Sequence, residues 1–339
     1  MQRRNLWALL AAAAVMAVLA VVVVSRGDRA VTRAPGTQRA LPGLADKLGE
    51  LSRLHLTRAA VTINFAALDH RWTIVEKGNY PADQDRVRKL LLQLADLELI
   101  EPKTDRPELL ARLDLDDPAN GKSTLVTAQD RGGALVAQLI IGRRRPNEIG
   151  GGDAGVYVRK PGGDQAWLAR GAFDLGGDAL SWIDRRVIDI APARVASVVL
   201  TAPDGNAVIV ARGSPDQPFA IDGLPADSRP KPDAALAAPA GALEALDLDD
   251  VKPASEQPIP EEGTTTASFT TFDGLVVGLR LSPPDAGDWL AIDATGFGRG
   301  EDEAKALSAR LAQWRFAIPA ERAKLLRTTL SDLLLPRGS

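Results

Sequence analysis

Short runs of alternating apolar and polar residues follow one another from about residue 50 to about residue 295. Strict alternation puts neighbouring side chains on opposite faces of a strand, so these runs predict strands with one buried face. Two stretches between them carry apolar residues at helical spacing instead. One runs from Gln84 to Leu97, and a weaker, alanine-rich one lies near Pro232 to Leu246. The pattern therefore predicts an α+β fold.

The same order of elements occurs twice along the chain. Each copy begins with two alternating strands and continues with an aromatic-centred strand, around Trp72 in the first copy and Phe219 in the second. A Pro-Ala-Asp tripeptide, a helix and a closing hairpin then follow in both copies. Several correspondences in one order indicate an internal repeat. We therefore expect two tandem homologous modules of mainly antiparallel sheet with a packed helix, in which Trp72 and Phe219 occupy matching core positions.

The pattern turns helical again after the second copy. One helix is predicted from about Glu301 to Trp314, and another from about Ala320 to Leu334. The last helix has an apolar stripe formed by Leu325, Leu326, Leu330 and Leu333. Such a stripe either folds back on the second module or contacts a partner protein.

An apolar run of 19 residues without a charge, Leu6 to Val24, lies near the N-terminus. As a helix it would span about 28 Å, which is close to the thickness of a bilayer core. The alternative is a cleaved secretory signal, which has a shorter apolar core and a small-x-small cleavage site. The run ends in four valines followed by Ser25 and Arg26, a poor cleavage site. We expect an uncleaved signal anchor, and a lipoprotein is excluded because the chain has no cysteine to acylate.

The charges beside this segment do not fix its orientation, because Arg3 and Arg4 precede it and three further arginines follow it. The whole folded part comes after the helix, however, and a short N-terminal stub is easily retained in the cytoplasm. We therefore expect a single-pass protein of the bacterial inner membrane with most of its chain in the periplasm. The expected parts are a stub and anchor (1–24), a spacer (25–40), a first α+β module (41–190), a second α+β module (191–300) and C-terminal helices (301–339).

Composition and charge narrow the classes of function. Hydrophobic residues make up 45% of the chain, enough for each module to bury a core. The formal net charge is −3, so nucleic-acid binding is disfavoured, because it needs a surplus of clustered lysines and arginines. Five of the six tryptophans have apolar neighbours and are expected as core anchors: Trp72, Trp167, Trp182, Trp289 and Trp314. The sixth, Trp7, is expected at the membrane interface.

Two motifs carry charge or glycine in arrangements that favour anion binding. Gly296-Phe297-Gly298-Arg299-Gly300 sits between a predicted strand and a predicted helix, where a phosphate-binding turn would lie. Three acidic residues follow it directly, and these stabilise the helix dipole but repel a phosphate, so we favour a structural role. Arg143-Arg144-Arg145 would suit an anionic lipid or glycan, but we favour the solvated end of a strand followed by a glycine-rich loop.

The remaining candidates for catalysis or metal binding are weak. Leu113 to Asp117 and Leu246 to Asp250 share an acidic pattern, yet they lack the glycine and terminal glutamate of a calcium loop. His55 and His70 are the only histidines and there is no cysteine, which excludes a zinc site and a Cys/His nucleophile. No Gly-x-Ser-x-Gly elbow is present. We therefore predict no catalytic residue, no metal ligand, no cofactor and no enzymatic activity.

Several longer phrases resemble a known family. They are Trp72 to Asp83, Val87 to Leu91, Ile100 to Thr104, Ile140 to Arg144, Val156 to Arg159, Ala166 to Leu168, Trp182 to Arg186 and Trp314 to Pro319. Together they resemble the domain of unknown function 4340 family over nearly the whole chain. The chain departs from the family pattern at Gly150-Gly151-Gly152 and in the Pro/Ala-rich stretch from Pro225 to Pro239.

The resemblance implies one N-terminal anchor, repeated α+β units and genetic association with ABC-type export components of the gliding-motility auxiliary kind. It supplies no catalytic residues. We therefore expect a non-enzymatic, membrane-anchored accessory or scaffold protein associated with an ABC-type transporter or envelope complex. The expected partners are the inner membrane and ABC permease and ATPase subunits. The alternative is a periplasmic binding module for an anionic lipid or glycan. The sequence does not predict an oligomeric state.

Overall fold

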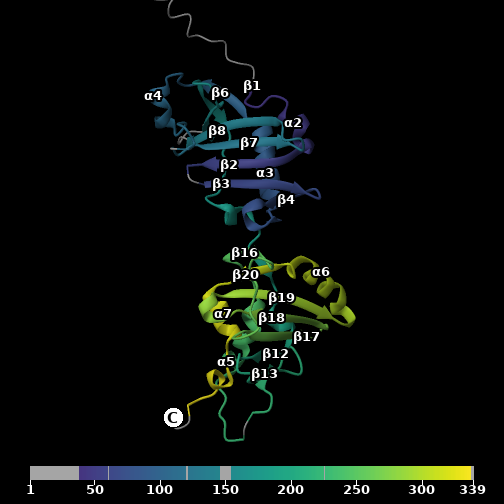
Figure 1. Ribbon diagram of the computed structural model, residues 1–339. Helices are drawn as coiled ribbons and strands as arrows, with labels where there is room; N and C mark the ends of the chain where they lie inside the picture. Colours follow the sequence, from purple (N-terminus) through teal and green to yellow (C-terminus); the bar gives the residue numbers. More distant parts are fainter. Residues whose placement is uncertain (1–37, 60, 120, 146–153, 225, 337–339) are drawn as a thin grey trace, which may run out of the picture.

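The computed structural model describes residues 38–59, 61–119, 121–145, 154–224 and 226–336. Over these ranges the chain forms two large antiparallel sheets that lie end to end, with several short helices against them (Figure 1). This confirms the predicted α+β class. The predicted membrane anchor falls outside the described residues, and none of the helices described is long and apolar enough to cross a membrane.

The first half of the chain forms a ten-stranded sheet in the order β1-β6-β10-β9-β8-β7-β2-β3-β4-β5. Its strands are β1 (Gln38–Arg39), β2 (Leu51–Arg58), β3 (Val61–Leu68), β4 (Arg71–Ile74), β5 (Tyr80–Pro81), β6 (Glu98–Pro102), β7 (Thr124–Asp130), β8 (Leu135–Arg145), β9 (Gly155–Arg159) and β10 (Ala166–Arg170). Alternation is clear in β2, where Leu54 and Leu56 are buried while His55 between them faces outward. The apolar positions that predicted these strands are therefore the positions that are buried in the core.

The second half forms an eight-stranded sheet in the order β14-β13-β12-β17-β18-β19-β20-β16. Its strands are β12 (Val195–Thr201), β13 (Ala207–Ala211), β14 (Ala220–Ile221), β16 (Asp250–Pro253), β17 (Thr265–Thr271), β18 (Leu275–Leu281), β19 (Trp289–Gly296) and β20 (Trp314–Ala317). Two further strands, β11 (Arg186–Ile188) and β15 (Leu246–Asp247), pair only with each other.

The two sheets have equivalent strand orders. Read from the β4 side, the first sheet runs β4-β3-β2-β7-β8-β9-β10-β6, and the second runs β14-β13-β12-β17-β18-β19-β20-β16 in the same positions. Even an irregularity recurs. The register between β2 and β7 shifts after Leu51, and the register between β12 and β17 shifts after Val195, at the equivalent position. A β-bulge of this kind bends a strand locally and increases its twist. The sheets are therefore curved at corresponding points.

This register places Trp72 and Phe219 at equivalent positions, because Ile74 and Ile221 lie opposite equivalent residues of β3 and β13. Their burial differs, however. Phe219 is buried, whereas Trp72 is half-exposed and packs only against the margin of the core. The expectation of a core position is therefore wrong for Trp72. Of the other tryptophans singled out, Trp182 and Trp314 are buried, while Trp167 and Trp289 are half-buried.

The helix of the first half, α3 (Gln84–Ala95), matches its prediction. Asp83 caps its N-terminus by accepting a hydrogen bond from the backbone N–H of Arg86. Val87, Leu90, Leu91 and Leu94 are buried against the sheet. The helix predicted in the second half is broken instead into α5 (Asp233–Ala237) and a 3₁₀ turn over Ala238–Leu243. Proline at position 239 explains the break, because it supplies no backbone N–H and crowds the preceding turn.

The C-terminal region differs from its prediction in two ways. Helix α6 (Glu301–Leu311) ends early, and Trp314 begins strand β20, which belongs to the second sheet. The last helix is shorter than predicted and includes only Ala320–Leu326 (α7). A separate 3₁₀ turn follows it, and a capping box at Thr329 stabilises the start of that turn. The predicted apolar stripe is packed on the second module, with Leu326 and Leu333 buried and Leu325 and Leu330 partly buried.

The other helical turns are short. They are α2 (Leu44–Lys47), α4 (Pro107–Leu110) and 3₁₀ turns over Leu48–Glu50, Val75–Lys77, Ala111–Leu113, Ala179–Trp182, Pro192–Arg194, Pro284–Ala286, Gly298–Gly300 and Leu330–Leu333.

Strand pairing crosses three of the expected boundaries between parts. Strand β1 lies in the expected spacer but pairs with β6. Strand β11 lies in the expected first module but pairs with β15 of the second. Strand β20 lies among the expected C-terminal helices but pairs with β16 and β19. Each of these strands is too short to show a clear alternation in the sequence.

Candidate functional site

Three phrases that carry the family resemblance meet where the two sheets adjoin. Tyr80, in edge strand β5 of the first sheet, lies against β20 of the second. Its ring contacts Trp314 edge to face, with ring centroids 4.9 Å apart, and lies 6.4 Å from Phe316. All three rings are buried. Burial raises the pKa of the Tyr80 hydroxyl, while nearby Arg310 lowers it and Asp184 raises it. The hydroxyl is therefore neutral at ordinary pH.

Trp182 fixes the start of the segment that links the sheets. Its fully buried ring packs edge to face on Phe65, with centroids 5.1 Å apart. Its indole N–H donates to the carbonyl of Leu175 at 3.2 Å, and the guanidinium of Arg86 lies 4.6 Å from the ring centroid. Arg86 also donates to the carbonyl of Ser181. These contacts attach the segment to helix α3 and to the first sheet.

The Pro-Ala-Asp phrase of the first half pairs directly with this linking segment. The backbone N–H of Asp83 donates to the carbonyl of Trp182 at 2.7 Å, and Ala82 forms an isolated bridge with Ile183. The Asp83 side chain meanwhile caps α3. One tripeptide therefore ends a strand, starts a helix and holds the linker.

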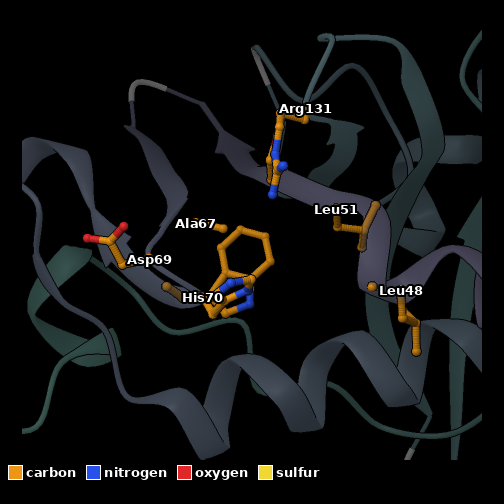
Figure 2. Close-up of a pocket in the computed structure, with 9 residues that line it drawn as sticks. Leu48, Leu51, Ala67, Asp69, His70 and Arg131 are labelled. Atoms are coloured by element: carbon orange, nitrogen blue, oxygen red, sulfur yellow. The ribbon is translucent and has the colours of Figure 1, made fainter.

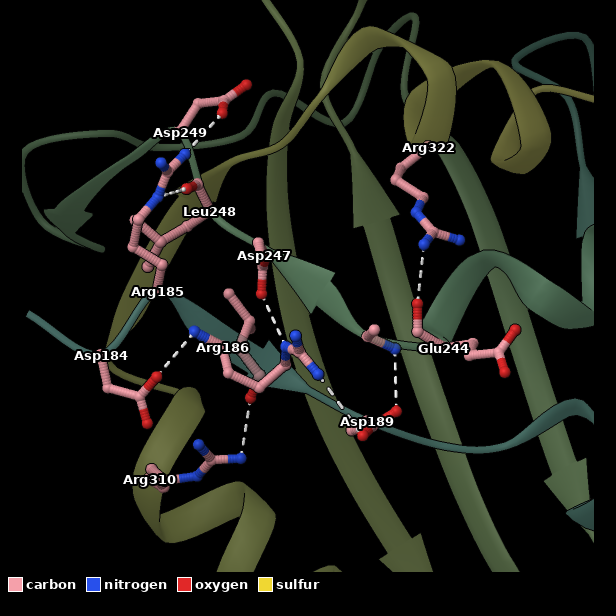
Figure 3. A network of polar contacts seen from close by, with 12 residues as sticks. Asp184, Arg185, Arg186, Asp189, Glu244, Asp247, Leu248, Asp249, Arg310 and Arg322 are labelled. Carbon is pink, nitrogen blue, oxygen red and sulfur yellow. Dashed lines mark hydrogen bonds and ion pairs between the residues drawn. The ribbon is translucent and has the colours of Figure 1, made fainter.

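A polar network then attaches the linker to the second half (Figure 3). Arg185 donates to the carbonyl of Leu248 at 2.9 Å and pairs with Asp249 at 3.0 Å. Arg186 pairs with Asp247 at 2.6 Å, and this hydrogen bond is the main cause that raises the pKa of Arg186. The acidic pattern at 246–250 is therefore used in ion pairs.

Two further contacts cross the junction directly. Lys77 and Asp250 form an ion pair at 2.6 Å, with side chains 19% and 33% exposed. Gly78 has φ +64°, and a Cβ there would lie 2.2 Å from the ring of Pro253. Only glycine combines this backbone conformation with so close an approach. Strands β5 and β16, the adjoining edges of the two sheets, also contact each other.

A cleft of about 810 Å³ opens beside the junction. Its charged walls are Arg71, Arg186, Arg310, Asp83, Asp85 and Asp184. Several of these groups already have structural roles, since Arg310 donates to the carbonyl of Val187 at 2.8 Å and Asp83 caps α3. The walls of the cleft therefore carry three cationic and three anionic side chains.

A smaller pocket of about 310 Å³ lies at one end of the first sheet. In Figure 2, His70 and Arg131 point into the same space. Asp69 and His70 both have positive φ, 47° and 63°, in the turn between β3 and β4. Trp72 lines the same pocket, and its backbone N–H and carbonyl are both bonded by the Gln84 side chain at 2.8 Å.

The two histidines do not share a site. His55 lies on the outer face of β2, where one ring nitrogen lies 2.6 Å from Oδ1 of Asn64 and the other 3.3 Å from Oε1 of Gln129. His70 lies in the turn of the smaller pocket. Across the ranges that the structure covers, no three histidine or acidic side chains are grouped so that they would hold a metal ion.

The glycine-rich turn at 296–300 has a packing role. A Cβ on Gly300 would lie 2.3 Å from the backbone nitrogen of Leu275, and one on Gly296 would lie 2.5 Å from the carbonyl oxygen of Gly300. The turn is therefore pressed against the β17–β18 hairpin. Glu303, in the first turn of α6, pairs with Arg194 at 2.6 Å. Both observations favour the structural interpretation of the motif.

The arginine run lies partly beside the residues that hold the linking segment. Arg143 lies 5.9 Å from the ring centroid of Tyr157 on β9. Arg144 lines a cavity of about 590 Å³ together with Asp83, Arg86 and Lys89. In the first acidic pattern, Asp114 has φ 53°, so Asp114 and Asp116 do not lie on one face of an extended strand.

The junction contacts escaped sequence reasoning because they join residues far apart in the chain. Tyr80 and Trp314 each occupy an apolar position that any core would explain. The only signal was that both stand in phrases that the sequence analysis compared with the family, and that signal does not identify them as neighbours.

The comparisons with known proteins give one match. The family model described as Domain of unknown function (DUF4340) matches residues 72–260, more than half of the 339-residue chain. The match begins inside β4 and ends shortly after β16, so it includes Tyr80 and the linking segment but not Trp314. No curated protein and no solved structure matches the chain. The chain belongs to the family of Domain of unknown function (DUF4340).

Proposed function

We propose that this chain is a non-enzymatic accessory or scaffold protein of the bacterial inner membrane, with its folded part in the periplasm, associated with an ABC-type transporter or envelope complex. The observation that carries the proposal is the aromatic and ionic junction, which joins two modules into one elongated body. A scaffold needs fixed spacing between its contact surfaces, and a buried junction supplies it.

We further propose that the two modules are homologous. The equivalent strand order and the bulge repeated after Leu51 and Val195 support this origin. Duplication of a sheet module produces a longer body without a new fold. In this interpretation α6 and the broken helix around Pro239 are later differences between the copies.

The free edges of the sheets lie at the two ends of the body. Edges β5 and β16 meet at the junction, whereas β1 and β14 form the outer edges. Strand β1 directly follows the segment that includes the expected anchor, so β14 is the edge farther along the body from the membrane. An exposed edge presents unpaired backbone groups that a partner strand can pair with. We propose β14 as a contact for the partner complex.

Co-purification tests the association. Tagged full-length protein is solubilised from its native membranes in mild detergent, and the retained proteins are identified by mass spectrometry. The proposal expects ABC permease and ATPase subunits at constant ratio to the chain. A matched pair of variants then locates the contact: Ile221→Pro on the edge strand β14 should reduce retention, and Leu68→Ala, at an exposed position of the interior strand β3, should not. Purification without any partner would contradict the proposal.

The membrane anchor has its own test. If residues 6–24 form an uncleaved helix, the protein resists carbonate extraction and keeps Met1 or Gln2 at its N-terminus. Val15→Arg should impair insertion, because a charge near the centre of a membrane helix costs about 2.5 to 3.5 kcal/mol on the insertion scale. A soluble chain that begins near Ser25 would contradict the anchor.

A second candidate function is capture of an anionic lipid or glycan between the modules. The cleft beside the junction supports it, because Arg71, Arg186 and Arg310 lie on its walls and could hold an anion, next to three carboxylates. In the same purification, lipid or glycan that remains bound without protein partners would support this alternative. Arg71→Gln should then weaken ligand retention while leaving any protein partner in place.

A further inference from the structure

The outer face of the first sheet is covered by the chain itself. Residues of the segment between β6 and β7 pack there in a second, smaller core. It consists of Leu110, Leu115, Ile140 and Ala166, with Leu113, Leu125 and Tyr157 at its margin. The fit is close, since a Cβ on Gly142 would lie 2.3 Å from the carbonyl oxygen of Leu113. This face of the first sheet is therefore apolar and occupied.

The equivalent face of the second sheet is different. The segment between β16 and β17 is only residues 254–264 and contains no helix. The place of Ile140, opposite Leu125, is taken by Arg280, opposite Thr266. Arg280 lies opposite Ala291 on β19, and the next strands bring Arg315 of β20 opposite Lys252 of β16. On this face, the second sheet therefore carries cationic side chains where the first sheet carries apolar ones.

Alternation places this row on the face away from the core. Leu279 and Leu281 on either side of Arg280 are buried, and so are Trp314 and Phe316 on either side of Arg315. Trp289 lies on the same outer face, with its ring centroid 4.9 Å from Nζ of Lys252. The row thus joins three cations to one half-exposed aromatic ring.

None of the three cations forms an ion pair with a carboxylate of the described chain. Lys252 donates to the side-chain oxygen of Gln257 at 3.4 Å, and Arg280 donates to the carbonyl of Ile259 at 3.4 Å. Arg315 donates to the carbonyls of Ala312 and Trp314, at 3.2 and 2.7 Å. Its Nε is buried and has no hydrogen-bond partner there.

The electrostatics agree with this geometry. Burial lowers the pKa of Arg315, and repulsion by Arg280 lowers it further. Two carboxylates of these strands share the face, but Asp250 is paired with Lys77 and Asp293 lies beside Gly278 on the neighbouring row. The adjoining segment 254–264 also carries Glu256, Glu261 and Glu262. Among the described residues, none of these carboxylates forms an ion pair with Lys252, Arg280 or Arg315, so the three cations are not neutralised by direct contact.

We propose that Lys252, Arg280 and Arg315, beside Trp289, form a binding site for a phosphate group. Neighbouring residues in a sheet row are about 5 Å apart, so side chains from β18, β20 and β16 span about 15 Å and can converge on one anion. Guanidinium groups match the oxygens of phosphate with forked N–H donors. A phosphate monoester carries about −1.5 to −2 charge, which suits three cations better than a carboxylate does.

The half-exposed ring of Trp289 adds a surface for the group that carries the phosphate. That group is either a lipid or a soluble phosphate ester such as a phosphorylated sugar, since both present an apolar or ring carbon surface next to the phosphate. Binding is a property of this chain alone. The result of the binding test is therefore independent of whether the proposed partner complex is found.

Titration calorimetry of the full-length protein in non-ionic detergent tests the site. Three probes are compared at physiological ionic strength: inorganic phosphate, a sugar phosphate and short-chain phosphatidic acid, each against an equal concentration of chloride. Saturable binding is expected. Arg280→Gln with Arg315→Gln should weaken it at least about tenfold, because each charge-assisted contact contributes a large part of the affinity. The matched control is Arg53→Gln with Arg88→Gln, which removes the same charge from exposed positions of the first half.

Arg315 is half-buried, so its variant is checked for folding by thermal unfolding, and Arg280→Gln with Lys252→Gln provides a second pair that leaves Arg315 intact. Binding of all three probes identifies soluble phosphate esters as ligands, and binding of phosphatidic acid alone identifies a lipid; either supports the site. Absence of saturable binding of every probe to the wild-type protein overturns the proposal. So does equal affinity in the wild type and in both folded double variants.

Discussion

A few aromatic side chains connect the halves of this protein. Trp182 fixes the linking segment to the first sheet, and Tyr80 joins the first sheet to Trp314 and Phe316 of the second. Edge-to-face aromatic pairs contribute about 0.5–1.5 kcal/mol beyond the area they bury. Each ring is also fully or nearly fully removed from water. Substitution at these positions should therefore affect stability more than most changes elsewhere.

Replacing Trp182 by alanine should destabilise the protein by about 3 to 5 kcal/mol, because it leaves a cavity beside Phe65 and removes the ring under Arg86. Urea unfolding of purified wild type and variant measures the loss. Trp72→Ala is the comparison, since Trp72 is half-exposed and should lose less. Equal losses for both variants would show that burial of Trp182 is not the cause.

Tyr80 gives a prediction for the pH dependence of stability. Its pKa is raised in the folded state, so the folded state keeps the proton in a range where the unfolded state has lost it. The unfolded state then binds fewer protons, and stability falls as pH rises above about 10. Tyr80→Phe should remove this part of the alkaline loss. Unfolding midpoints between about pH 9 and pH 11.5 measure it, and identical slopes in both proteins would contradict the assignment.

Tyrosinate absorbance provides the control for that experiment, because the chain has only two tyrosines. In Tyr80→Phe, the folded protein shows the titration of Tyr157 alone. The difference between wild type and variant is then the titration of Tyr80.

At the scale of elements, alternation and helical spacing in the sequence predicted most strands, their repeated order and helix α3 with its buried stripe. Very short strands such as β1, β11 and β20 were not predicted, because two to four residues do not show a period. The second helix was predicted too long because the alanine-rich pattern outweighed Pro239. The row Lys252, Arg280 and Arg315 was invisible, since it depends on the register of three strands.

The tight turn before α6 provides a prediction at this scale. Gly300→Ala should destabilise the protein by about 1–3 kcal/mol, because the new methyl group would lie 2.3 Å from the backbone nitrogen of Leu275 and force α6 away from the sheet. Thermal unfolding monitored by circular dichroism measures the change. Gly177→Ala serves as the matched control, since nothing lies within 4 Å of its added Cβ. Equal stability of the two variants would contradict the close packing of Gly300 against Leu275.

On the scale of the whole molecule, the junction determines whether the two sheets act as one body. The buried residues of both sheets form one continuous core cluster, and the Tyr80 cluster, the Lys77–Asp250 ion pair and the linking segment lie where the two sheets adjoin. Ion pairs at the surface contribute little, but this pair is largely shielded from water and lies beside the aromatic cluster. Cooperative unfolding of both sheets should therefore depend on a small number of residues.

Calorimetry of a variant with Tyr80→Ala and Lys77→Ala tests this dependence. In the wild type we expect a single unfolding transition, because the buried junction makes separation of the sheets unfavourable while both are folded. Loss of the Tyr80 ring and of the ion pair should split it into two, with the sheet of the first half, which contains β5, unfolding first. Arg53→Ala with Leu68→Ala, at exposed positions of the same sheet, should keep one transition. A single transition in the junction variant would mean that the linking segment alone couples the sheets, and two transitions in the wild type would mean that the sheets are not coupled.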